Sequence, residues 1–309
     1  MIPRIEHMLK YFFRSSVILM LILVQQNASG QQTPKSGQPE TAEETLIYKE
    51  CEGEDLRLVI LKPESSEVSE RHPAIVFFFG GGWVGGSIKQ FRTHAEYFRS
   101  RGMVAILADY RTRKSHATTP KECVADAKSA VRYLRANAEK LRIDPTRICA
   151  AGGSAGGHLA AATATLSKFD EPGEDTKVSA VPNALVLFNP VFDNGPNQWG
   201  HKKVKDYWND ISPAHNIREG MPPAIVFLGD QDKLISVATA RKFKMKMEQV
   251  GARSDLHVYQ DKGHGFFNFG RDKNRAFVDT VTKTDSFLVE LGFLAGACNL
   301  EQFLKREKN

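Results

Sequence analysis

The sequence predicts a doubly wound α/β domain, in which helices cover both faces of a mostly parallel sheet. Short β-rich runs alternate with helical stretches from Leu46 onward. Two of the β-rich runs, 74–79 and 184–188, are apolar at every position, which is typical of strands buried on both faces. The chain has 309 residues, 41% of them hydrophobic, so it is long enough to build one large core. We therefore expect one catalytic domain over residues 46–292.

Residues 1–30 have the pattern of a signal peptide. Lys10 and Arg14 precede an unbroken apolar run over residues 17–24, and small residues follow at 28–30. The apolar run is short for a bilayer span, so we expect no stable membrane insertion. The pattern predicts a secreted or periplasmic protein, and a membrane anchor formed by an uncleaved N-terminal segment is the alternative.

The charge balance does not point to nucleic acid as a partner. The whole chain carries a formal net charge of +6, from 42 Lys and Arg against 36 Asp and Glu. Removal of residues 1–30 takes away three basic residues and one acidic residue, which leaves 39 against 35, or +4. The charges alternate in sign without a run of five or six basic residues, so they indicate a solvated surface.

Two segments outside the predicted domain look unlike a folded core. Residues 31–45 are rich in Gln, Ser, Pro, Glu and Thr with almost no large apolar side chains, which predicts a flexible linker. Residues 293–309 are expected to form a C-terminal tail. Between them, strands are expected near 55–62, 74–79, 103–108, 146–151, 184–189, 223–229 and 254–259. Helices are expected near 89–101, 120–141, 155–167, 236–250 and 272–291. Residues 191–220, rich in Asn, Trp, Pro and His, are expected to form a short lid insertion over the strand ends.

The four cysteines, Cys51, Cys123, Cys149 and Cys298, all follow the predicted signal peptide. An exported chain can form disulfides, and four cysteines allow three complete pairings, which the spacing leaves open. Cys149 lies in an apolar predicted strand and is expected to be a small buried hydrophobic residue. No pair has the short spacing of a zinc site.

The strongest chemical signal is the run Gly152-Gly153-Ser154-Ala155-Gly156, which joins a predicted strand to an Ala-rich predicted helix. A serine at such a strained turn needs small neighbours, because side chains at 152 and 156 would collide with the adjacent strand and helix. The turn places the hydroxyl at the helix N-terminus, where N–H groups stabilise developing negative charge. We expect Ser154 to be a nucleophile. The alternative is a phosphate-cradling turn, but the chain lacks the G-x-x-x-x-G-K pattern.

A serine nucleophile requires a base that a carboxylate orients. His264 follows the last predicted strand between two glycines and is the expected base. Asp232, in the loop after strand 223–229, is favoured as the acid. Its neighbour Asp230 and the later Asp261 remain alternatives, since Asp is common in turns for structural reasons.

Two further positions complete the expected site. The glycine run 80–82 follows the strand that ends at Phe79, and glycines permit the unusual φ angles that bring backbone N–H groups close to a substrate oxygen. His158 is expected one helical turn beyond the serine, where it packs or forms a hydrogen bond and takes no part in catalysis.

From about residue 46 to 292 the chain resembles the α/β-hydrolase esterase and lipase superfamily. Within it, the resemblance is closest to the feruloyl and acetyl-xylan esterase-like members of the hormone-sensitive-lipase-like group. The stretches that carry the resemblance are Gly80 to Trp83, Asp109-Tyr110-Arg111, Asp126 to Leu134, Asp144 to Ile148, Gly152 to Leu159 and Gly263 to Phe266. The chain order Ser, Asp, His, with each residue in a loop after its own strand, is also the order of that fold.

The resemblance implies a serine carboxylic ester hydrolase. Ser154 would be the nucleophile, Asp232 the acid and His264 the base. The N–H groups of Gly80, Gly81 and Ala155 would be the oxyanion donors.

The resemblance also implies that Asp126 and Arg111 form a structural ion pair. One position departs from the family, which usually has His before the three glycines, where this chain has Phe79. That histidine shapes the loop through its side chain, whereas the oxyanion donors are backbone groups, so we expect Phe79 to keep the oxyanion hole and to alter the rigidity of the loop.

The expected substrates are short-chain carboxylic esters, including acetylated or feruloylated carbohydrates, hydrolysed through an acyl-enzyme without metal or cofactor. Two alternatives remain. A peptidase of the prolyl-oligopeptidase type shares the serine turn and the order of the triad, although it usually carries a propeller for which 309 residues leave no room. A catalytically silent binding protein on the same fold would lack at least one member of the triad.

Overall fold

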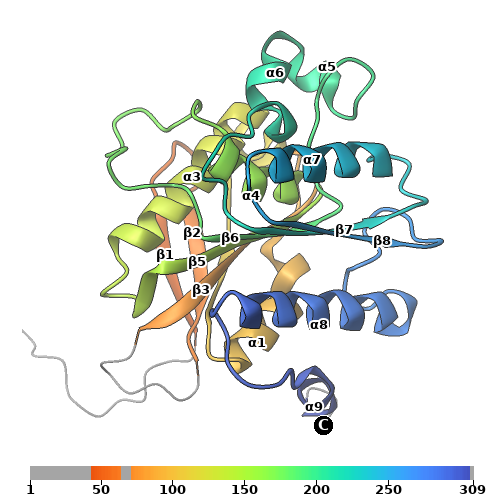
Figure 1. The fold of residues 1–309 in the computed structure, drawn as a ribbon. Coiled ribbons are helices and arrows are strands. Elements are labelled where there is room, and N and C mark those ends of the chain that lie inside the picture. Colours follow the sequence, from red (N-terminus) through yellow and green to blue (C-terminus); the bar gives the residue numbers. More distant parts are fainter. Residues whose placement is uncertain (1–42, 64–70, 307–309) are drawn as a thin grey trace, which may run out of the picture. The chain divides into compact units, whose positions relative to one another are not determined.

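The computed structural model describes residues 43–63 and 71–306, which contain one eight-stranded sheet (Figure 1). Its strands are β1 (Glu43–Lys49), β2 (Leu56–Leu61), β3 (His72–Phe78), β4 (Val104–Ala108), β5 (Ile143–Gly153), β6 (Ala184–Phe188), β7 (Ala224–Gly229) and β8 (Ser254–Tyr259). In the sheet they follow the order β1-β2-β4-β3-β5-β6-β7-β8. The first two pairs, β1 with β2 and β2 with β4, are antiparallel, and the remaining pairs are parallel. The predicted mostly parallel sheet is confirmed.

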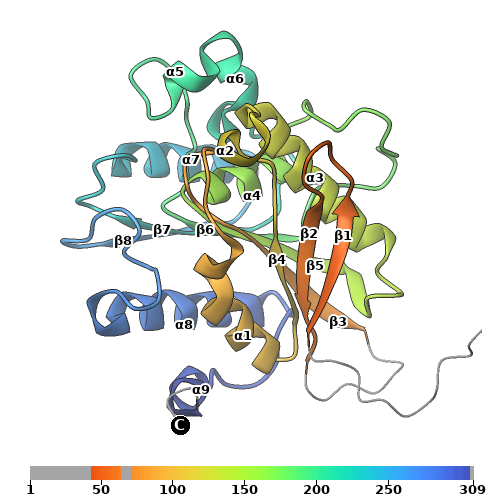
Figure 2. The same cartoon turned by 180° about the vertical axis from the view of Figure 1, so that it is seen from behind.

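Helices cover both faces of the sheet, as Figures 1 and 2 show from opposite sides. One face is covered by α3 (Pro120–Ala136), α4 (Ala155–Thr165) and α7 (Val237–Gln249), and the other by α1 (Arg92–Ser100) and α8 (Arg275–Glu290). The shorter helices are η1 (Ile88–Phe91), α2 (Arg113–His116), α5 (His201–Val204), η2 (Lys205–Tyr207), α6 (Trp208–Ile211), η3 (Pro213–His215), η4 (Asp272–Asn274) and α9 (Leu300–Arg306).

The continuously apolar runs form the centre of the sheet, as the sequence predicts. Every residue of β3 and of β6 is buried, because helices pack on both sides of these strands. Their alternate side chains enter two separate hydrophobic clusters, one on each face. Phe78 and Leu187 belong to the cluster on the α3–α4 face, and Phe77 and Phe188 to the cluster on the α1–α8 face.

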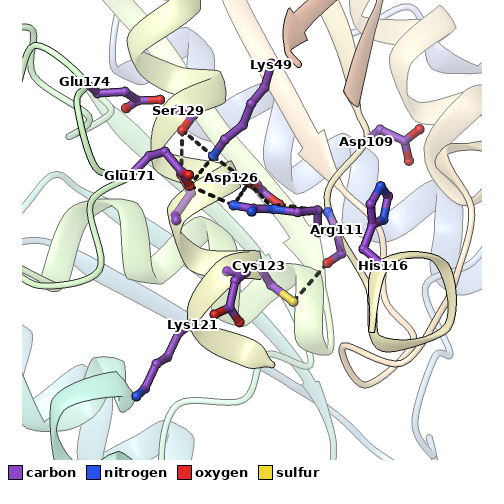
Figure 3. Close-up of polar contacts among 12 residues, drawn as sticks. Lys49, Asp109, Arg111, His116, Lys121, Cys123, Asp126, Ser129, Glu171 and Glu174 are labelled. Atoms are coloured by element: carbon purple, nitrogen blue, oxygen red, sulfur yellow. Dashed lines mark hydrogen bonds and ion pairs between the residues drawn. The ribbon is translucent and has the colours of Figure 1, made fainter. Parts of the chain in front are cut away.

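The predicted ion pair of Arg111 and Asp126 is the centre of a larger buried cluster (Figure 3). Arg111 donates to the Asp126 carboxylate through Nε at 2.9 and 3.0 Å and through Nη2 at 2.7 Å. Lys49 of β1 also donates to Asp126, at 2.7 Å, and both cations reach the Glu171 carboxylate. Because the Asp126 side chain is fully buried, these donors offset the cost of removing its charge from water. The cluster joins the edge strand, the loop after β4 and α3, and it lies outside the catalytic residues.

The structure corrects the predicted boundaries at both ends of the domain. The sequence interpretation missed β1, which begins at Glu43, so residues 43–45 of the predicted linker belong to an edge strand. Exposed residues such as Thr45 alternate with partly buried ones such as Leu46, and the strand pairs with β2 without a long apolar run. The predicted tail 293–309 contains α9, whose Leu300 is buried with Phe293 in the α1–α8 cluster.

The remaining predicted elements agree with the structure to within a few residues, apart from the second predicted helix, 120–141, which ends at Ala136. The predicted signal peptide 1–30 and residues 31–42 of the predicted linker lie outside the described residues. The predicted lid 191–220 contains the short helices α5, η2, α6 and η3. In the part of the chain that the structure describes, none of the helices combines the length and the apolar character needed to cross a membrane.

Candidate active site

Ser154 lies at the sharp turn between β5 and α4, with a backbone φ of 56° and ψ of −119°. This left-handed φ is strained for a residue with a side chain and holds the hydroxyl at the tip of the turn. A Cβ atom on Gly152 would lie 2.3 Å from the carbonyl oxygen of Gly156, and one on Gly156 would lie 2.0 Å from the carbonyl oxygen of Phe78. The predicted need for small residues on either side of the serine is confirmed.

The three predicted catalytic side chains meet at the carboxyl ends of their strands. His264 Nε2 lies 2.9 Å from Ser154 Oγ, and His264 Nδ1 lies 2.7 Å from Asp232 Oδ2. Since a carboxylate can only accept, Nδ1 carries the proton and Nε2 is free to accept the serine proton. The Asp232 side chain is fully buried, whereas 26% of the His264 side chain is exposed. The base, His264, is therefore accessible to solvent and substrate, whereas the acid, Asp232, is shielded from water.

The buried carboxylate of Asp232 is stabilised in its charged form. Burial alone would raise its pKa, but hydrogen bonds from His264 and from the N–H groups of Ile235 and Leu234 hold the pKa below the usual value for an aspartate. The alternative acid, Asp230, instead accepts the N–H of Asp261 at 2.8 Å and stabilises a turn. The preference for Asp232 over these two alternatives agrees with the geometry.

The glycine loop after β3 presents backbone N–H groups beside the nucleophile, but they differ from the predicted set. The Gly80 N–H donates to the side-chain oxygen of Gln90 at 2.6 Å, so it is not available as an oxyanion donor. Within residues 43–63 and 71–306, the Gly81 and Gly82 N–H groups donate no hydrogen bond. Ala155 is the first residue of α4, so its N–H has no partner inside the helix. Gly81, Gly82 and Ala155 are therefore the free donors near Ser154.

A chain of side-chain amides connects this glycine loop with the histidine loop. Gln90 Nε2 donates to Asn268 Oδ1 at 2.9 Å, and Asn268 Nδ2 donates to the Gly265 carbonyl at 2.8 Å. On its other side, the Gly265 N–H donates to Asn189 Oδ1 at 2.9 Å. Sequence reasoning did not find these three amides. Only Asn189 had a local signal, because it is the last residue of a predicted strand.

Phe79, which stands where the family usually has histidine, is buried under the glycine loop with 2% of its surface exposed. Its ring stacks on Tyr110 with centroids 4.1 Å apart, and the Tyr110 hydroxyl donates to the Phe79 carbonyl at 2.8 Å. A Cβ atom on Gly86 would lie 2.3 Å from the Phe79 ring, so the loop folds tightly over it. Apolar packing and the Tyr110 hydrogen bond thus help to hold the start of the glycine loop.

Ser154 and His264 open into a cleft of about 610 Å³. Its large apolar walls are Trp199, Leu234 and Phe267. The lid contributes Trp199 together with Lys203, whose ammonium lies 5.0 Å from the centre of the Trp199 ring. Lys203 also donates to the Gly82 carbonyl at 2.7 Å, so the lid also holds the glycine loop.

The other predicted candidates have structural roles. His158 is fully buried, and its Nε2–H donates to the Ile211 carbonyl of the lid at 2.8 Å, as the sequence analysis expected of a packing residue. The four cysteines are unpaired, and Cys149 is buried in β5 as predicted. Among the described residues, no group of three or more His, Cys, Asp or Glu side chains is arranged to hold a metal ion.

Comparisons with known proteins agree with this geometry. The family model described as BD-FAE matches residues 58–193. Esterase LipC of Mycobacterium tuberculosis is 29% identical over 217 residues, which cover 63% of this chain and 53% of that protein. The acetylxylan esterase of Xylanibacter ruminicola is 26% identical over 185 residues, which cover 56% of this chain and 36% of that protein. The chain thus spans about half or less of the length of these curated relatives.

Solved structures give a match over nearly their full length. The propionate-bound structure of a thermophilic esterase from Thermogutta terrifontis is 44% identical, with a TM-score of 0.79, over 84% of this chain and 98% of that one. A structure of Thermogutta terrifontis esterase 2 phosphorylated by paraoxon is 45% identical, with a TM-score of 0.78 over the same shares. The identity and coverage relate this chain to esterases over most of the described residues.

Proposed function

This chain belongs to the α/β-hydrolase esterase family, and we propose from that membership that it hydrolyses short-chain carboxylic esters through an acyl-enzyme on Ser154. The observation that carries the proposal is the hydrogen-bonded series from Asp232 through His264 to Ser154, with distances of 2.7 and 2.9 Å. A binding protein on this fold does not need a buried acid, an oriented base and a strained nucleophile that are joined by hydrogen bonds.

The geometry supports a two-step reaction. His264 Nε2 accepts the proton of Ser154 as its oxygen attacks the ester carbonyl, and Asp232 stabilises the imidazolium that forms. The negative oxygen of the tetrahedral intermediate is held by the free N–H groups of Gly81, Gly82 and Ala155. The carbon–oxygen bond to the alcohol then breaks, and His264 gives the proton to the leaving alcohol. In the second step, His264 takes a proton from water, which attacks the acyl carbon. The bond from the acyl carbon to Ser154 Oγ then breaks, the acid leaves, and His264 returns the proton to Ser154.

Two kinds of similarity support the substrate class. The Thermogutta esterase was solved with propionate, which indicates a pocket for short acyl groups in that protein. The matched BD-FAE model and the acetylxylan esterase relative favour an ester of a carbohydrate. The open cleft, with Trp199 as an aromatic wall, offers a flat surface for a sugar ring or an aromatic alcohol.

Paraoxon gives a direct test, because it labels a serine nucleophile without requiring the natural substrate. Ser154 Oγ is expected to displace 4-nitrophenolate from phosphorus and to keep the diethylphosphoryl group. We expect one equivalent of 4-nitrophenolate and one label, located on Ser154 by peptide mass spectrometry. Ser154→Ala should release none, and Ser87→Ala, a change of another serine that lines the cleft, should label normally.

A substrate panel identifies the reaction class. We expect hydrolysis of 4-nitrophenyl acetate and butyrate and of acetylated xylan, and no cleavage of a peptide 4-nitroanilide. Labelling at another residue, or cleavage of the amide in preference to the ester, would overturn the proposal.

We also propose that residues 1–30 direct export of the chain, on the basis of the charged start, the apolar run and the small residues that follow. Expression of the full chain in a bacterium, followed by fractionation and N-terminal sequencing, tests this. A mature N-terminus close to residue 31 in the periplasm or medium is expected. An intact N-terminus in the membrane fraction would favour the uncleaved anchor.

A further inference from the structure

The charges that line the catalytic cleft all have one sign. Among the described residues, the side chains that line the cleft include two cations, Lys203 and Arg271, and no carboxylate. The acid of the triad, Asp232, is fully buried behind His264 and is paired with it. Unpaired positive charge in the cleft does not attract a neutral ester, whereas it does attract an ester that carries a carboxylate.

Arg271 lies on the same loop as the catalytic base, and its guanidinium is unused. Asp272, its neighbour in the chain, pairs instead with Lys262 at 2.6 Å and with Arg275 at 2.5 Å. In residues 43–63 and 71–306, no acceptor bonds the Arg271 side chain. Its Nη1 lies 3.7 Å from the place that a Cβ atom on Gly265 would take, directly beside His264. The free, permanently charged guanidinium of Arg271 therefore lies next to the catalytic base, His264.

Hydrogen bonds within the histidine loop hold the backbone of Arg271 in place. The Arg271 N–H donates to the Asn268 carbonyl at 3.3 Å, and Asn268 is tied to the Gly265 carbonyl and to Gln90. The backbone that carries the guanidinium is therefore anchored to both catalytic loops. Anchoring lowers the entropy that the loop loses when Arg271 binds a ligand.

Lys203 adds positive charge from the lid side. Burial lowers its pKa, and the charge of the nearby Arg113 lowers it further. Its ammonium donates a hydrogen bond to the Gly82 carbonyl. Lys203 therefore holds the glycine loop and adds to the positive electrostatic potential of the cleft. Arg271 is the cation whose donors are free to form a new bond.

The chemistry of the triad assigns a side of the ester to Arg271. His264 protonates the leaving alcohol, so the alcohol lies beside His264 when the ester bond breaks. The carbonyl oxygen lies at the glycine loop on the other side of Ser154. Because Arg271 lies beside His264, it faces the alcohol part of the substrate.

We propose that Arg271 forms a carboxylate-binding subsite on the alcohol side of the cleft, so that esters whose alcohol carries a carboxylate, such as an acetylated sugar bearing a uronic acid, are preferred substrates. The proposal rests on the ester hydrolase activity proposed above. The guanidinium donates two parallel hydrogen bonds to the carboxylate, and Lys203 strengthens the attraction without direct contact.

A matched pair of small esters tests the subsite. The anion of 3-acetoxybenzoic acid and its neutral methyl ester have the same acetyl group, and only the first carries a carboxylate on the alcohol part. The quantity to measure is the ratio of kcat/KM for the anionic ester to kcat/KM for the neutral one. Comparison of variants through this ratio cancels the intrinsic reactivity of the two esters.

We expect Arg271→Gln to lower this ratio about tenfold, mainly through a higher KM for the anionic ester. Arg271→Lys keeps the positive charge but cannot form the two parallel hydrogen bonds, so it should restore only part of the ratio. Lys273→Gln, a change of an exposed cation two residues further along the chain that does not line the cleft, should leave the ratio at the wild-type value. Addition of 0.5 M salt should lower the wild-type ratio, because an accessible charge pair is screened.

The outcomes separate the subsite from the activity on which it rests. If the wild-type protein hydrolyses neither ester, the proposed function fails. If it hydrolyses both esters but Arg271→Gln leaves the ratio unchanged, the subsite is wrong and the activity stands. An equal loss for both esters in Arg271→Gln would assign the residue a role in shaping the histidine loop, and would also overturn the subsite.

Discussion

The Gly80 N–H donates to the side-chain oxygen of Gln90 at 2.6 Å, and this bond is the first of a series that connects the glycine loop to the loop of the catalytic base. The same amide donates through Nε2 to Asn268, which in turn holds the Gly265 carbonyl. Gln90 thus makes contact with both halves of the catalytic apparatus. In this chain the glycine loop is held by an amide and by the packed ring of Phe79 in place of the usual histidine.

The first prediction is that Gln90 positions the free N–H groups of the glycine loop. Gln90→Leu leaves the Gly80 N–H without an acceptor and frees the loop, so kcat on a neutral acetate ester should fall about tenfold with little change in KM. Gln90→Glu keeps the acceptor for Gly80 and removes the donor to Asn268, so it should recover part of kcat. Steady-state kinetics with a melting curve for each variant checks this. A kcat for Gln90→Leu within twofold of wild type would rule out the positioning role.

A second prediction concerns the triad as a unit. Ser154→Ala should leave the protein folded and remove ester hydrolysis, since it deletes the nucleophile with a small change in volume. His264→Ala should be similarly inactive, and the double variant should lose little beyond either single one, because the members of a triad do not act independently. The measurement is the steady-state rate of 4-nitrophenyl acetate hydrolysis by each variant. Losses that add in the double variant would show that the two residues do not work together.

The third prediction is that Phe79→His changes stability more than rate. The Phe79 side chain is buried and stacks on Tyr110, so an imidazole there loses apolar contact and gains a buried polar group. We expect the free energy of unfolding to fall by about 1–2 kcal/mol. The rate should change only a fewfold, because the oxyanion donors are backbone groups. Denaturant unfolding and kcat/KM check the two halves, and a gain of about a thousandfold, or roughly 4 kcal/mol of barrier, would mean that Phe79 cripples the oxyanion hole.

The fourth prediction concerns acid stability and follows from two buried imidazoles. His94 lies among five phenylalanine rings, and within the part of the chain that the structure describes neither of its ring nitrogens has a hydrogen-bond partner. Burial lowers the pKa of His94 to about 3. Burial also lowers the pKa of His158 to about 4, although the hydrogen bond to the Ile211 carbonyl opposes the shift. Both values lie below the pKa of about 6.5 that histidine has in an unfolded chain.

The unfolded state therefore binds more protons than the folded state between pH 6.5 and these lowered values. Stability should be complete above pH 6.5 and should fall as the pH drops, by about 2 kcal/mol per histidine between pH 6.5 and pH 5. Urea unfolding at a series of pH values measures the slope. His94→Leu should remove one histidine's share of the slope, and an unchanged slope in that variant would contradict the burial argument.

The sequence predicted what local chemistry requires and missed what only the assembled fold brings together. Ser154 was predictable because the strained turn demands small residues on both sides within five positions. His264 and Asp232 were predictable because each follows an apolar strand, and parallel strands end at the same edge of the sheet. Gln90 and Asn268 are 178 residues apart, and neither has a local pattern that marks an amide as a bridge.

The misassigned ends of the domain have a similar cause. The segment Glu43–Lys49 is rich in charge, so its composition resembles a linker, yet it pairs with a neighbouring strand and places Lys49 against the buried Asp126. The assignment of Gly80 as an oxyanion donor came from the resemblance alone. It could not anticipate that Gln90 takes this N–H, because Gln90 follows ten residues later and no local pattern marks it as a partner of Gly80.

The last prediction concerns the length of the acyl chain. In the described part of the cleft, the large apolar side chains are Trp199, Leu234 and Phe267, and Leu234 is 44% exposed. Of the lid, only Trp199 and Lys203 line the cleft, so it offers no continuous apolar cover for a long chain. Each methylene contributes about 0.8 kcal/mol of binding free energy only when it is removed from water. This gain should end once the acyl group extends beyond these three side chains.

We therefore expect kcat/KM for 4-nitrophenyl esters to peak between acetyl and butyryl and to fall toward chains of ten or more carbons. Leu234→Ala should lower the butyryl-to-acetyl ratio about twofold, since it removes part of an already exposed wall. Met245→Ala, a change of a half-exposed side chain on α7 that does not line the cleft, should leave the ratio at its wild-type value. A maximum at ten carbons or beyond would show that the lid shields long chains after all, and the protein would then act as a lipase rather than as a short-chain esterase.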